Sequence, residues 1–363
     1  MLEVADRSVS TDAEHFDSPA PSAPKRAPGL SLNAVNNWVP HDLVMRDSWF
    51  PLAHDHAVGK TPVRRAVYSQ PFYIWREDGK VVASEFHPLE IVTRPKSPYT
   101  DARGRYPVME HYGLIWGWFG NPQAADPAHL PSLPFLPPKG GLPKHMTATI
   151  RFDCSAPISL ENLIDLTHAD FLHADVVGDE KSDSEDVEVF YDSETITMVR
   201  TLVNKSVAPI MKFFSGIRQP TQNVRQVIRI YLRSHCAIAY GRFSPGDDVP
   251  LFHPCTPESR DRTRMEMVMN TSNAGTMFRH VMPKAGYKVS RQDSSMTNPQ
   301  SPRYMDLTPR KDLHSKFDQA GQRYRLLMMD LAARQDAGDF EYRDNVSADC
   351  SDIIGLRKEL FQF

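Results

Sequence analysis

The stretch Ser159–Asp175, with the sequence SLENLIDLTHADFLHAD, places Asn162, Asp165, His168 and His173 in a short run that is otherwise mostly apolar. The first three of these residues are spaced by three positions, so on a helix of about 100° per residue they line one face. His173 follows His168 by five positions, which is roughly 140° away from that face. The two imidazoles can therefore reach one point only if the helix opens between them.

We predict a helix through His168 that opens near Ala169–Phe171 and leads into a loop with His173. Two histidines and one distant carboxylate form the facial triad that holds Fe(II) and leaves coordination positions open for O2. The alternative is a chance pair, because the chain has 14 histidines and most histidines are ordinary core or surface residues. The spacing of all four polar residues favours the metal site.

Composition narrows the class of protein. The 363 residues suffice for two domains, and 40% hydrophobic with 24% charged residues is typical of a soluble globular protein. A formal charge of -3 gives no basic footprint for nucleic acid or an anionic membrane. No apolar run is long enough to span a membrane. The cysteines are scattered without a CxxC or CxH pair, which argues against a disulfide framework or a Cys-ligated cluster and fits a reducing compartment: Cys154, Cys236, Cys255 and Cys350.

The chain before the metal motif divides into three parts. Residues 1–35 are rich in Ala, Ser, Pro and Asp and predict a disordered leader; their acidic residues indicate a mature form rather than a transit peptide. Residues 36–120 predict a first domain with two strand-like runs, Ala66–Trp75 and Lys80–Phe86, joined by a turn at Glu77–Gly79. Residues 121–145 contain seven prolines and predict an extended linker between domains.

Residues 146–340 predict the domain that holds the metal. Alternating runs indicate a large antiparallel sheet with one buried face and one face toward a cavity or solvent: MTATIRFDC (146–154), EDVEVFYD (185–192), ETITMVRTLV (194–203), VRQVIRIYLRS (224–234), CAIAYGRF (236–243) and TRMEMVMNT (263–271). Lys311–Ala337 predicts a covering helix, with Tyr324, Leu327, Met328 and Leu331 at helical spacing. A sheet closed by a helix is a helix-grip arrangement, which suits a bulky, flat, apolar ligand. Residues 341–363 predict a C-terminal tail.

The string Asn-x2-Asp-x2-His-x4-His resembles the mononuclear-iron signature of the Rieske-type oxygenases. The hairpin and YPVMEHYGLIWGWFG (106–120) resemble the shell of a Rieske domain. Such a domain holds a [2Fe–2S] cluster with two Cys and two His, but no Cys precedes Cys154 and only His87 stands where a ligand pair is expected. The resemblance therefore predicts an α+β protein: a degenerate all-β Rieske-like domain without a cluster, followed by a helix-grip catalytic domain.

Three further stretches resemble the group of chlorophyllide a and pheophorbide a oxygenases: His253–Met267, the region around Gln292-Asp293, and Phe317–Leu327. In that group the carboxylate ligand lies upstream of an Arg-Tyr-Arg element, and Asp293 stands 30 residues before Arg323. The resemblance thus implies Asp293 as the third iron ligand. The sequence SSMTNPQSP that follows contains Pro299 and Pro302, which argue against a long regular helix there. Three alternatives for this ligand stay open: Asp306, Asp312 and Asp318.

The resemblance also implies a reaction. Fe(II) would be held by His168, His173 and Asp293, with Asn162 in the site and Asp165 passing electrons from the Rieske cluster of a neighbouring subunit. Since this chain lacks cluster ligands, the cluster is expected on a homologous partner in a trimer-based hetero-oligomeric ring, with ferredoxin as reductant. The expected reaction oxidises the C7 methyl of chlorophyllide a to the formyl group found in chlorophyll b, in a chloroplast, in the stroma or at the thylakoid.

Other classes of protein remain in view. A catalytically inactive structural or regulatory subunit would agree with the altered sequence after Asp293, but it does not need the intact set of Asn162, Asp165, His168 and His173. A pigment carrier would likewise leave the two histidines unexplained. A zinc hydrolase could use the same triad, although nothing else in the chain supports it.

Overall fold

The computed structural model describes residues 38–361 apart from 91–93, 179–180, 307–311 and 315–317. The predicted leader, residues 1–35, lies outside this range. The α+β prediction is confirmed: the described chain combines helices with three antiparallel sheets of three, seven and four strands. None of its helices is long and apolar enough to cross a membrane. All four cysteines are buried and free.

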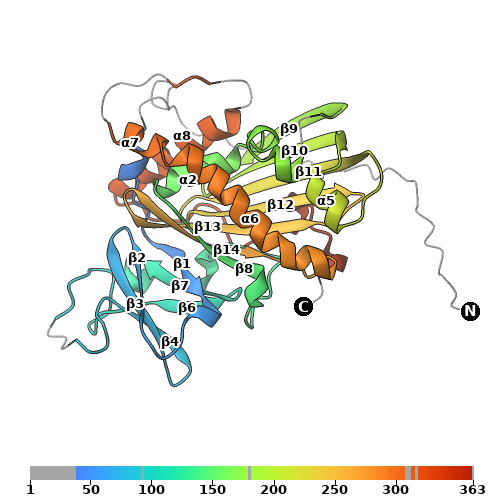
Figure 1. Cartoon of the computed structure of the whole chain (residues 1–363). Coiled ribbons are helices and arrows are strands. Elements are labelled where there is room, and N and C mark those ends of the chain that lie inside the picture. The colour runs from blue at the N-terminus through green and yellow to red at the C-terminus, as the bar shows by residue number, and fades with distance from the viewer. Residues whose placement is uncertain (1–37, 91–93, 179–180, 307–311, 315–317, 362–363) are drawn as a thin grey trace, which may run out of the picture.

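The seven-stranded sheet is the centre of the molecule (Figure 1). Its strands pair antiparallel throughout, so side chains two residues apart share a face. In spatial order the strands are β8 (Thr147–Phe152), β14 (Arg262–Met269), β13 (Val249–Ser259), β12 (Cys236–Ser244), β11 (Thr221–Tyr231), β10 (Thr195–Ser206) and β9 (Ser184–Tyr191).

Strand β13 is the one large-sheet strand that the alternation pattern missed. It lies between β14 and β12 and contains Pro250, Pro254 and Pro257. Proline cannot donate to a ladder, so its presence argues against an inner strand. Here Pro254 falls between the registered pairs Phe252↔Val268 and Cys255↔Met265, and Pro257 precedes a register shift. Pro254 and Pro257 thus lie at or next to irregularities in the pairing with β14, where a missing amide donor is tolerated.

Helices cover one face of this sheet. The long helix α6 (Thr276–Thr297) crosses it, with α2 (Ala156–Ile164) beside it (Figure 1). The predicted C-terminal helix is confirmed as α8 (Gln319–Asp336), with Tyr324, Leu327, Met328 and Leu331 buried. The shorter helices are α3 (Ala169–Leu172), α4 (Ala174–Val177), α5 (Pro209–Phe214) and α7 (Gln300–Met305), while α9 (Ser351–Ile354) belongs to the tail.

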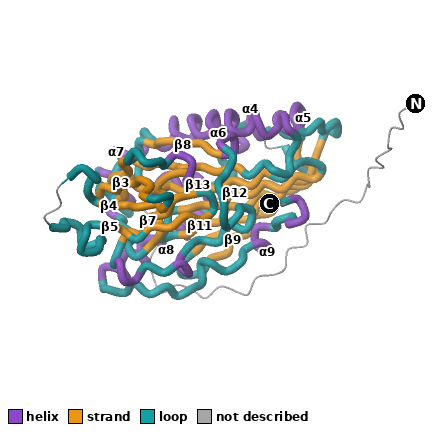
Figure 2. The backbone as a smooth tube through the Cα atoms, turned by 90° about the horizontal axis from the view of Figure 1, so that it is seen from below, coloured by secondary structure: helices purple, strands orange, loops and turns teal. Residues whose placement is uncertain are grey.

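The opposite face is covered by the Pro-rich segment and the tail. Residues 121–145 form three short 3-10 turns, Pro122–Ala124, Pro127–His129 and Lys144–Met146, and bury Leu133 and Phe135 in the same cluster as the tail. In the tail, the Ile354 carbonyl accepts a hydrogen bond of 2.7 Å from Arg225 on β11. Figure 2 shows α6 and α9 on opposite sides of the sheet. Because one face is sealed by these segments, a ligand site must lie on the other.

The N-terminal part forms two small sheets. The first has the order β1 (Ser48–His54), β7 (Leu114–Phe119), β6 (Val108–His111), and the second has the order β2 (Val63–Val67), β3 (Gln70–Glu77), β4 (Lys80–Ser84), β5 (Arg105–Tyr106). The turn predicted between β3 and β4 is present, with positive φ at Asp78 and Gly79. Two further 3-10 turns are Pro40–Asp42 and Asp55–Ala57, and one in the tail is Lys358–Leu360.

The prediction of one strand over Ala66–Trp75 is wrong, because the chain reverses at Tyr68 and Ser69. Both have positive φ, 46° and 67°, which side chains other than Gly, Asn and Asp seldom adopt. Tertiary hydrogen bonds hold the turn: the amide of Tyr68 donates to the Pro257 carbonyl, and the Tyr68 hydroxyl lies 2.7 Å from His235 Nε2. The residues at this turn include no Gly, Asn, Asp or Pro, so the local sequence does not predict it.

A buried ionic cluster joins the small sheets to the large one. Glu266 on β14 lies 3.0 Å from Nδ1 of His54 on β1, and its carboxylate accepts a 2.7 Å hydrogen bond from Thr149 on β8. Arg264 donates to the same carboxylate. Burial alone would raise the pKa of Glu266, but His54 and Arg264 outweigh it and hold this pKa at about 2. The ionised carboxylate therefore ties three strands from both parts of the chain together.

We expect Glu266→Gln to lower the free energy of unfolding by about 3 kcal/mol at neutral pH, because it leaves buried cations without their partner. The native pKa lies below the ordinary value of 4.5, so the stabilisation is fully present above pH 4.5 and is lost as pH falls toward 2. The difference between wild type and variant should shrink over that window. Urea unfolding at several pH values measures it.

The matched control is Glu77→Gln, which removes a half-exposed ion pair of 3.2 Å with Arg105 and should cost less than about 1 kcal/mol. Equal losses in the two variants, or a difference for Glu266→Gln that does not change between pH 7 and pH 2, would contradict the role given to this cluster.

Candidate metal centre

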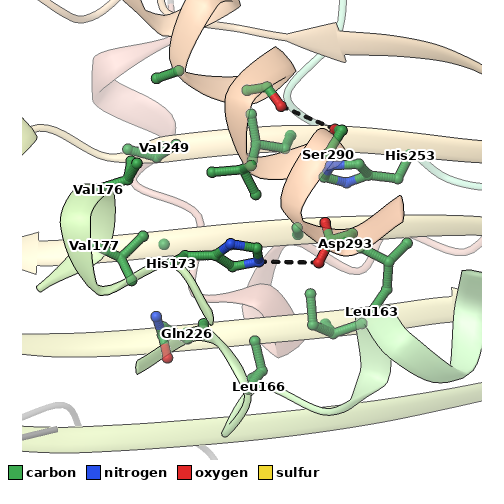
Figure 3. Close-up of a pocket in the computed structure, with 18 of the residues that line it drawn as sticks. Leu163, Leu166, His173, Val176, Val177, Gln226, Val249, His253, Ser290 and Asp293 are labelled. Carbon is green, nitrogen blue, oxygen red and sulfur yellow. Dashed lines mark hydrogen bonds and ion pairs between the residues drawn. The ribbon is translucent and has the colours of Figure 1, made fainter. Parts of the chain in front are cut away.

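The three predicted ligands lie together at the inner surface of α6. His168 Nε2 is 3.3 Å from His173 Nε2 and 3.4 Å from Asp293 Oδ1, and His173 Nε2 is 3.0 Å from the same oxygen. Figure 3 shows the His173 ring pointing at the Asp293 carboxylate. Among the described residues this is the single group of three His, Cys, Asp or Glu side chains close enough to share a metal ion. The structure brings Asp306, Asp312 and Asp318 into no such group.

The chain opens earlier than predicted. Helix α2 ends at Ile164, Asp165 has extended backbone angles, and His168 comes just before the separate short helix α3. The prediction of Asn162, Asp165 and His168 on one continuous helix is therefore wrong. The cause is local: the Asp165 carboxylate accepts hydrogen bonds from the amide and the hydroxyl of Thr167, which compete with helical bonds.

The expectation of no long helix around Asp293 is also wrong. Helix α6 has 22 residues and ends at Thr297, four residues past Asp293. Pro299 and Pro302 follow that end, and the chain continues into α7 at Gln300. The prolines thus end α6 rather than prevent it, because their effect reaches only the residues directly before them.

The geometry fits a metal ion. Two ligand atoms about 2.1 Å from one ion lie about 3.0 Å apart at a right angle and about 3.4 Å apart at the tetrahedral angle. The three measured distances, 3.0 to 3.4 Å, fall within this interval. The other nitrogens are engaged elsewhere: Nδ1 of His168 contacts the carbonyl of Asp165, and Nδ1 of His173 lies 3.0 Å from Gln292 Oε1. Each Nε2 is thereby directed at the common point.

The carboxylate of the group is held in its ionised form. Burial alone would raise the pKa of Asp293, but hydrogen bonds from His168 and His173 and the charges on their rings hold it well below the usual range. Asn162 adds a hydrogen bond of 3.0 Å from Nδ2 to Asp293 Oδ1. Burial would lower the pKa of His168, yet the same carboxylate raises it. A negatively charged oxygen is thus available as a ligand, and Asn162 fixes its position.

A chain of hydrogen bonds connects His173 to the surface. Beyond the bond to His173, the Gln292 amide donates to Asp175 at 3.2 Å, and Lys288 pairs with the same Asp175. No pattern in the sequence indicates this role for Gln292, although it adjoins the predicted ligand Asp293. Only the fold of α4 beside α6 reveals it.

Behind the opened helix lies a buried ion cluster centred on Asp170. Its two oxygens pair with Arg200 at 2.5 Å and Lys205 at 2.7 Å, and all three side chains are at most 4% exposed. Arg200 also donates to the carbonyl of Leu166 at 3.2 Å. Because Asp170 lies two residues after His168, this cluster anchors the segment that contains His168 against strand β10. Sequence reasoning missed it, since Asp170 looked like one more acidic residue.

The Arg-Tyr-Arg element has a supporting role. Arg325 on α8 donates to Glu161 of α2 at 2.8 Å and to Asp312 at 2.6 Å. Arg323 lies over the ring of Tyr191, 4.4 Å from its centroid. Arg325 therefore positions the helix that carries Asn162, and Asp312 is occupied as its counter-ion.

Asp165 lies at the rim of the group. One oxygen bonds Thr167, and the other is 4.0 Å from His168 Nδ1, which contacts the Asp165 main-chain carbonyl instead. Its side chain is 34% exposed, and the nearby Phe171 is 72% exposed. Asp165 therefore lies next to His168 as predicted, but its carboxylate makes no hydrogen bond to the imidazole ring; the main-chain carbonyl takes that place.

The predicted pocket between sheet and helices opens beside these residues. Its empty space is about 1300 Å3 when the part open to solvent is included. Its floor comes from alternate residues of β11 to β14, such as Leu251, His253, Met265 and Met267, and its roof from one side of α6. Burial lowers the pKa of His253 to about 4, against an opposing effect of Asp293. The metal group therefore faces an apolar chamber.

In the N-terminal part, His87 does not approach the metal group. Its ring packs edge-on against Tyr73, and its Nδ1 accepts a hydrogen bond of 3.2 Å from the Leu89 amide. Residues 91–93 after it lie outside the description. His87 thus has an ordinary structural environment among the residues that the structure describes.

Comparison with known proteins gives a family match. Residues 152–334 match the family described as the vanillate O-demethylase oxygenase C-terminal domain. The chain is 27% identical over 293 residues to the vanillate O-demethylase oxygenase subunit of Pseudomonas sp. strain HR199, covering 72% of this chain and 80% of that protein. It is 24% identical over 356 residues to the chloroplastic chlorophyllide a oxygenase of Arabidopsis thaliana, covering 82% of this chain and 59% of that protein.

Among solved structures, dicamba monooxygenase bound to 3,6-dichlorosalicylic acid has the same fold. It superimposes with a TM-score of 0.68 at 18% identity, covering 80% of this chain and 98% of that one.

We expect Gln292→Met to weaken Fe(II) binding by about 10- to 100-fold, because His173 loses the acceptor that orients its ring. Gln292→Glu retains an acceptor and should bind iron at least as tightly as wild type. Anaerobic titration of Fe(II) against a chelator measures the affinity.

The control is Lys284→Met, which changes an exposed residue of the same helix and should leave affinity unchanged. An unchanged affinity in Gln292→Met would show that the hydrogen bond does not position His173.

Proposed function

Because this chain belongs to the Rieske-type oxygenases, through a catalytic domain of the vanillate O-demethylase oxygenase family, we propose that it is the iron-bearing subunit of a two-component chlorophyllide a oxygenase. Its reaction oxidises the C7 methyl group to the formyl group of chlorophyllide b. The observation that carries this proposal is the group of His168, His173 and Asp293 at one side of a large apolar pocket.

The residues of the site have three separate roles. His168, His173 and Asp293 would hold Fe(II), which when bound supplies the site for O2 activation with coordination positions left open. Asn162 and Gln292 keep two of these ligands in place through hydrogen bonds of 3.0 Å each. The apolar walls exclude water and hold a flat ring system against the site.

The chemistry requires electrons from outside the chain. Each of the two oxidations consumes one O2, two electrons and two protons and releases water. The first converts the methyl group to a hydroxymethyl group, and the second gives a hydrate that loses a further water to form the aldehyde. No side chain of the metal group can supply electrons repeatedly, so a reductase system must deliver them.

In this proposal a Rieske cluster on a homologous partner subunit supplies the electrons, with ferredoxin as its reductant and a chloroplast as the compartment. The sequence has no cysteine before Cys154, so the two thiolate ligands of such a cluster would come from the partner. Next to His168, Asp165 is partly exposed and Phe171 is exposed, which suits docking of the partner there. Alternating subunits would close into a trimer-based ring.

A catalytically inactive subunit has less support. The altered sequence after Asp293, which would agree with such a subunit, completes α6 and then ends it. The three ligand side chains and the hydrogen bonds of Asn162 and Gln292 are all in place. A purely structural subunit has no physical need for this set.

Anaerobically purified protein loaded with Fe(II) should bind about one iron per chain, without acid-labile sulfide, and give a high-spin EPR signal with nitric oxide. His168→Ala should lose the iron, because it removes one of three ligands. His280→Ala removes an exposed histidine of α6 and should retain it. Failure of wild type to bind iron would favour the inactive subunit.

Asp165→Asn should bind iron as wild type does but form no 7-formyl product when combined with a Rieske-cluster subunit, ferredoxin, reductant and chlorophyllide a. The reason is that the amide cannot carry the charge that couples the partner's cluster to His168. Chromatography of the pigments measures the product. The control is Asp153→Asn, at a side chain that is 76% exposed; normal turnover in Asp165→Asn would refute the relay.

A further inference from the structure

Apart from the metal group itself, the described lining of the pocket offers no cationic side chain to a substrate. Among the residues that the structure describes, its lining includes no lysine and no arginine. Its ionisable members are the three ligands, His253 and Tyr240, and the Tyr240 hydroxyl is already bonded to Asp248. A buried carboxylate without a cation costs several kcal/mol.

The charges of this domain lie outside the pocket instead. Arg200 and Lys205 are used by Asp170 behind the opened helix, and Arg325 is used by Glu161 and Asp312. These cations are fixed at bond distances of 2.5 to 2.7 Å, so none of them is available to a ligand in the chamber. The interior is polar only at a few uncharged groups.

Gln226 is the uncharged group that has no role in the site described above. It lies on β11, lines the pocket, and its Oε1 is buried without a hydrogen-bond partner among the described residues. Figure 3 shows it on the opposite side of His173 from His253. An amide in an apolar wall needs a partner, and rotation about its last bond can present either oxygen or nitrogen to a ligand.

We infer that the pocket takes the methyl-bearing part of the substrate as an uncharged body, and that Gln226 orients this part through a hydrogen bond to a neutral carbonyl, hydroxyl or amide group. The inference rests on the proposed function and restricts it. The ring system of a tetrapyrrole enters the chamber, whereas its carboxylate stays outside the lining. The hydroxymethyl intermediate of the proposed reaction is one such neutral group.

A pair of probes with the same shape and different charge tests this inference. They are 6-methyl-2-naphthamide and 6-methyl-2-naphthoate, with 2,6-dimethylnaphthalene as the reference without a polar group. Binding to the Fe(II)-loaded protein under argon is followed by naphthalene fluorescence and by the EPR signal after nitric oxide. The amide should bind at least 10-fold tighter than the carboxylate.

Gln226→Leu should remove most of the preference for the amide over 2,6-dimethylnaphthalene and leave the affinity for the hydrocarbon unchanged. Gln222→Leu is the control, since it removes a buried amide from the same strand outside the pocket lining, and it should change neither affinity. Retained iron binding in both variants shows that they are folded.

Two outcomes would overturn the inference. One is that the carboxylate probe binds as tightly as the amide probe. If it binds through His253, His253→Phe abolishes the binding; if it binds to the iron, it changes the EPR signal. The other is an unaltered preference for the amide in Gln226→Leu. Because these are binding measurements, either outcome would contradict the role of Gln226 without contradicting the proposed iron site or the proposed reaction. Conversely, if the probes bind as expected but chlorophyllide a is not oxidised, chlorophyllide a is rejected as the substrate and the inference about the pocket stands.

Discussion

Two histidines five residues apart must reach one point, and the rest of the catalytic domain is arranged around that constraint. A continuous helix would hold the two rings on different sides. The chain instead leaves helical geometry at Asp165, whose carboxylate bonds Thr167, and resumes in the short helix α3. An opened segment has lost helical hydrogen bonds and needs other support. Asp170 supplies it, because its pairs with Arg200 and Lys205 anchor the segment to β10.

The third ligand comes from a different constraint. The large sheet has one face sealed by the Pro-rich segment and the tail, so α6 can lie only across the other. One side of this helix meets Met267 and Met269, where a side chain on Gly286 would lie within 3.1 Å of both. The same side continues to Asp293, two turns along. The packing of α6 on the sheet thereby sets the carboxylate opposite the histidines.

Charge is distributed in a consistent way across the domain. Ion pairs that carry structure are buried behind the elements they hold, as in Asp170 with Arg200 and Glu161 with Arg325. The chamber beside the metal group is left with apolar walls and a few neutral polar groups. A carboxylate that is ionised and hydrogen-bonded at the edge of such a chamber can bind a cation without competition from lysine or arginine. The ion pairs that stabilise the fold thus lie outside the chamber, whereas the carboxylate available to a metal lies at its edge.

The sequence by itself determined most strands, because period-2 alternation is a local property. The spacing of His168 and His173 predicted a metal site, and the resemblance to known oxygenases implied Asp293 as its third member; the structure places these three side chains 3.0 to 3.4 Å apart. The tertiary structure alone decided where α2 ends, that β13 forms despite three prolines, and that Tyr68 and Ser69 turn with positive φ. It alone brought Gln292, Asp170 and Gln226 to the site. Each of these features is stabilised by contacts with residues distant in the chain. Such contacts exist only after the sheet and helices have packed, so a local sequence pattern cannot predict them.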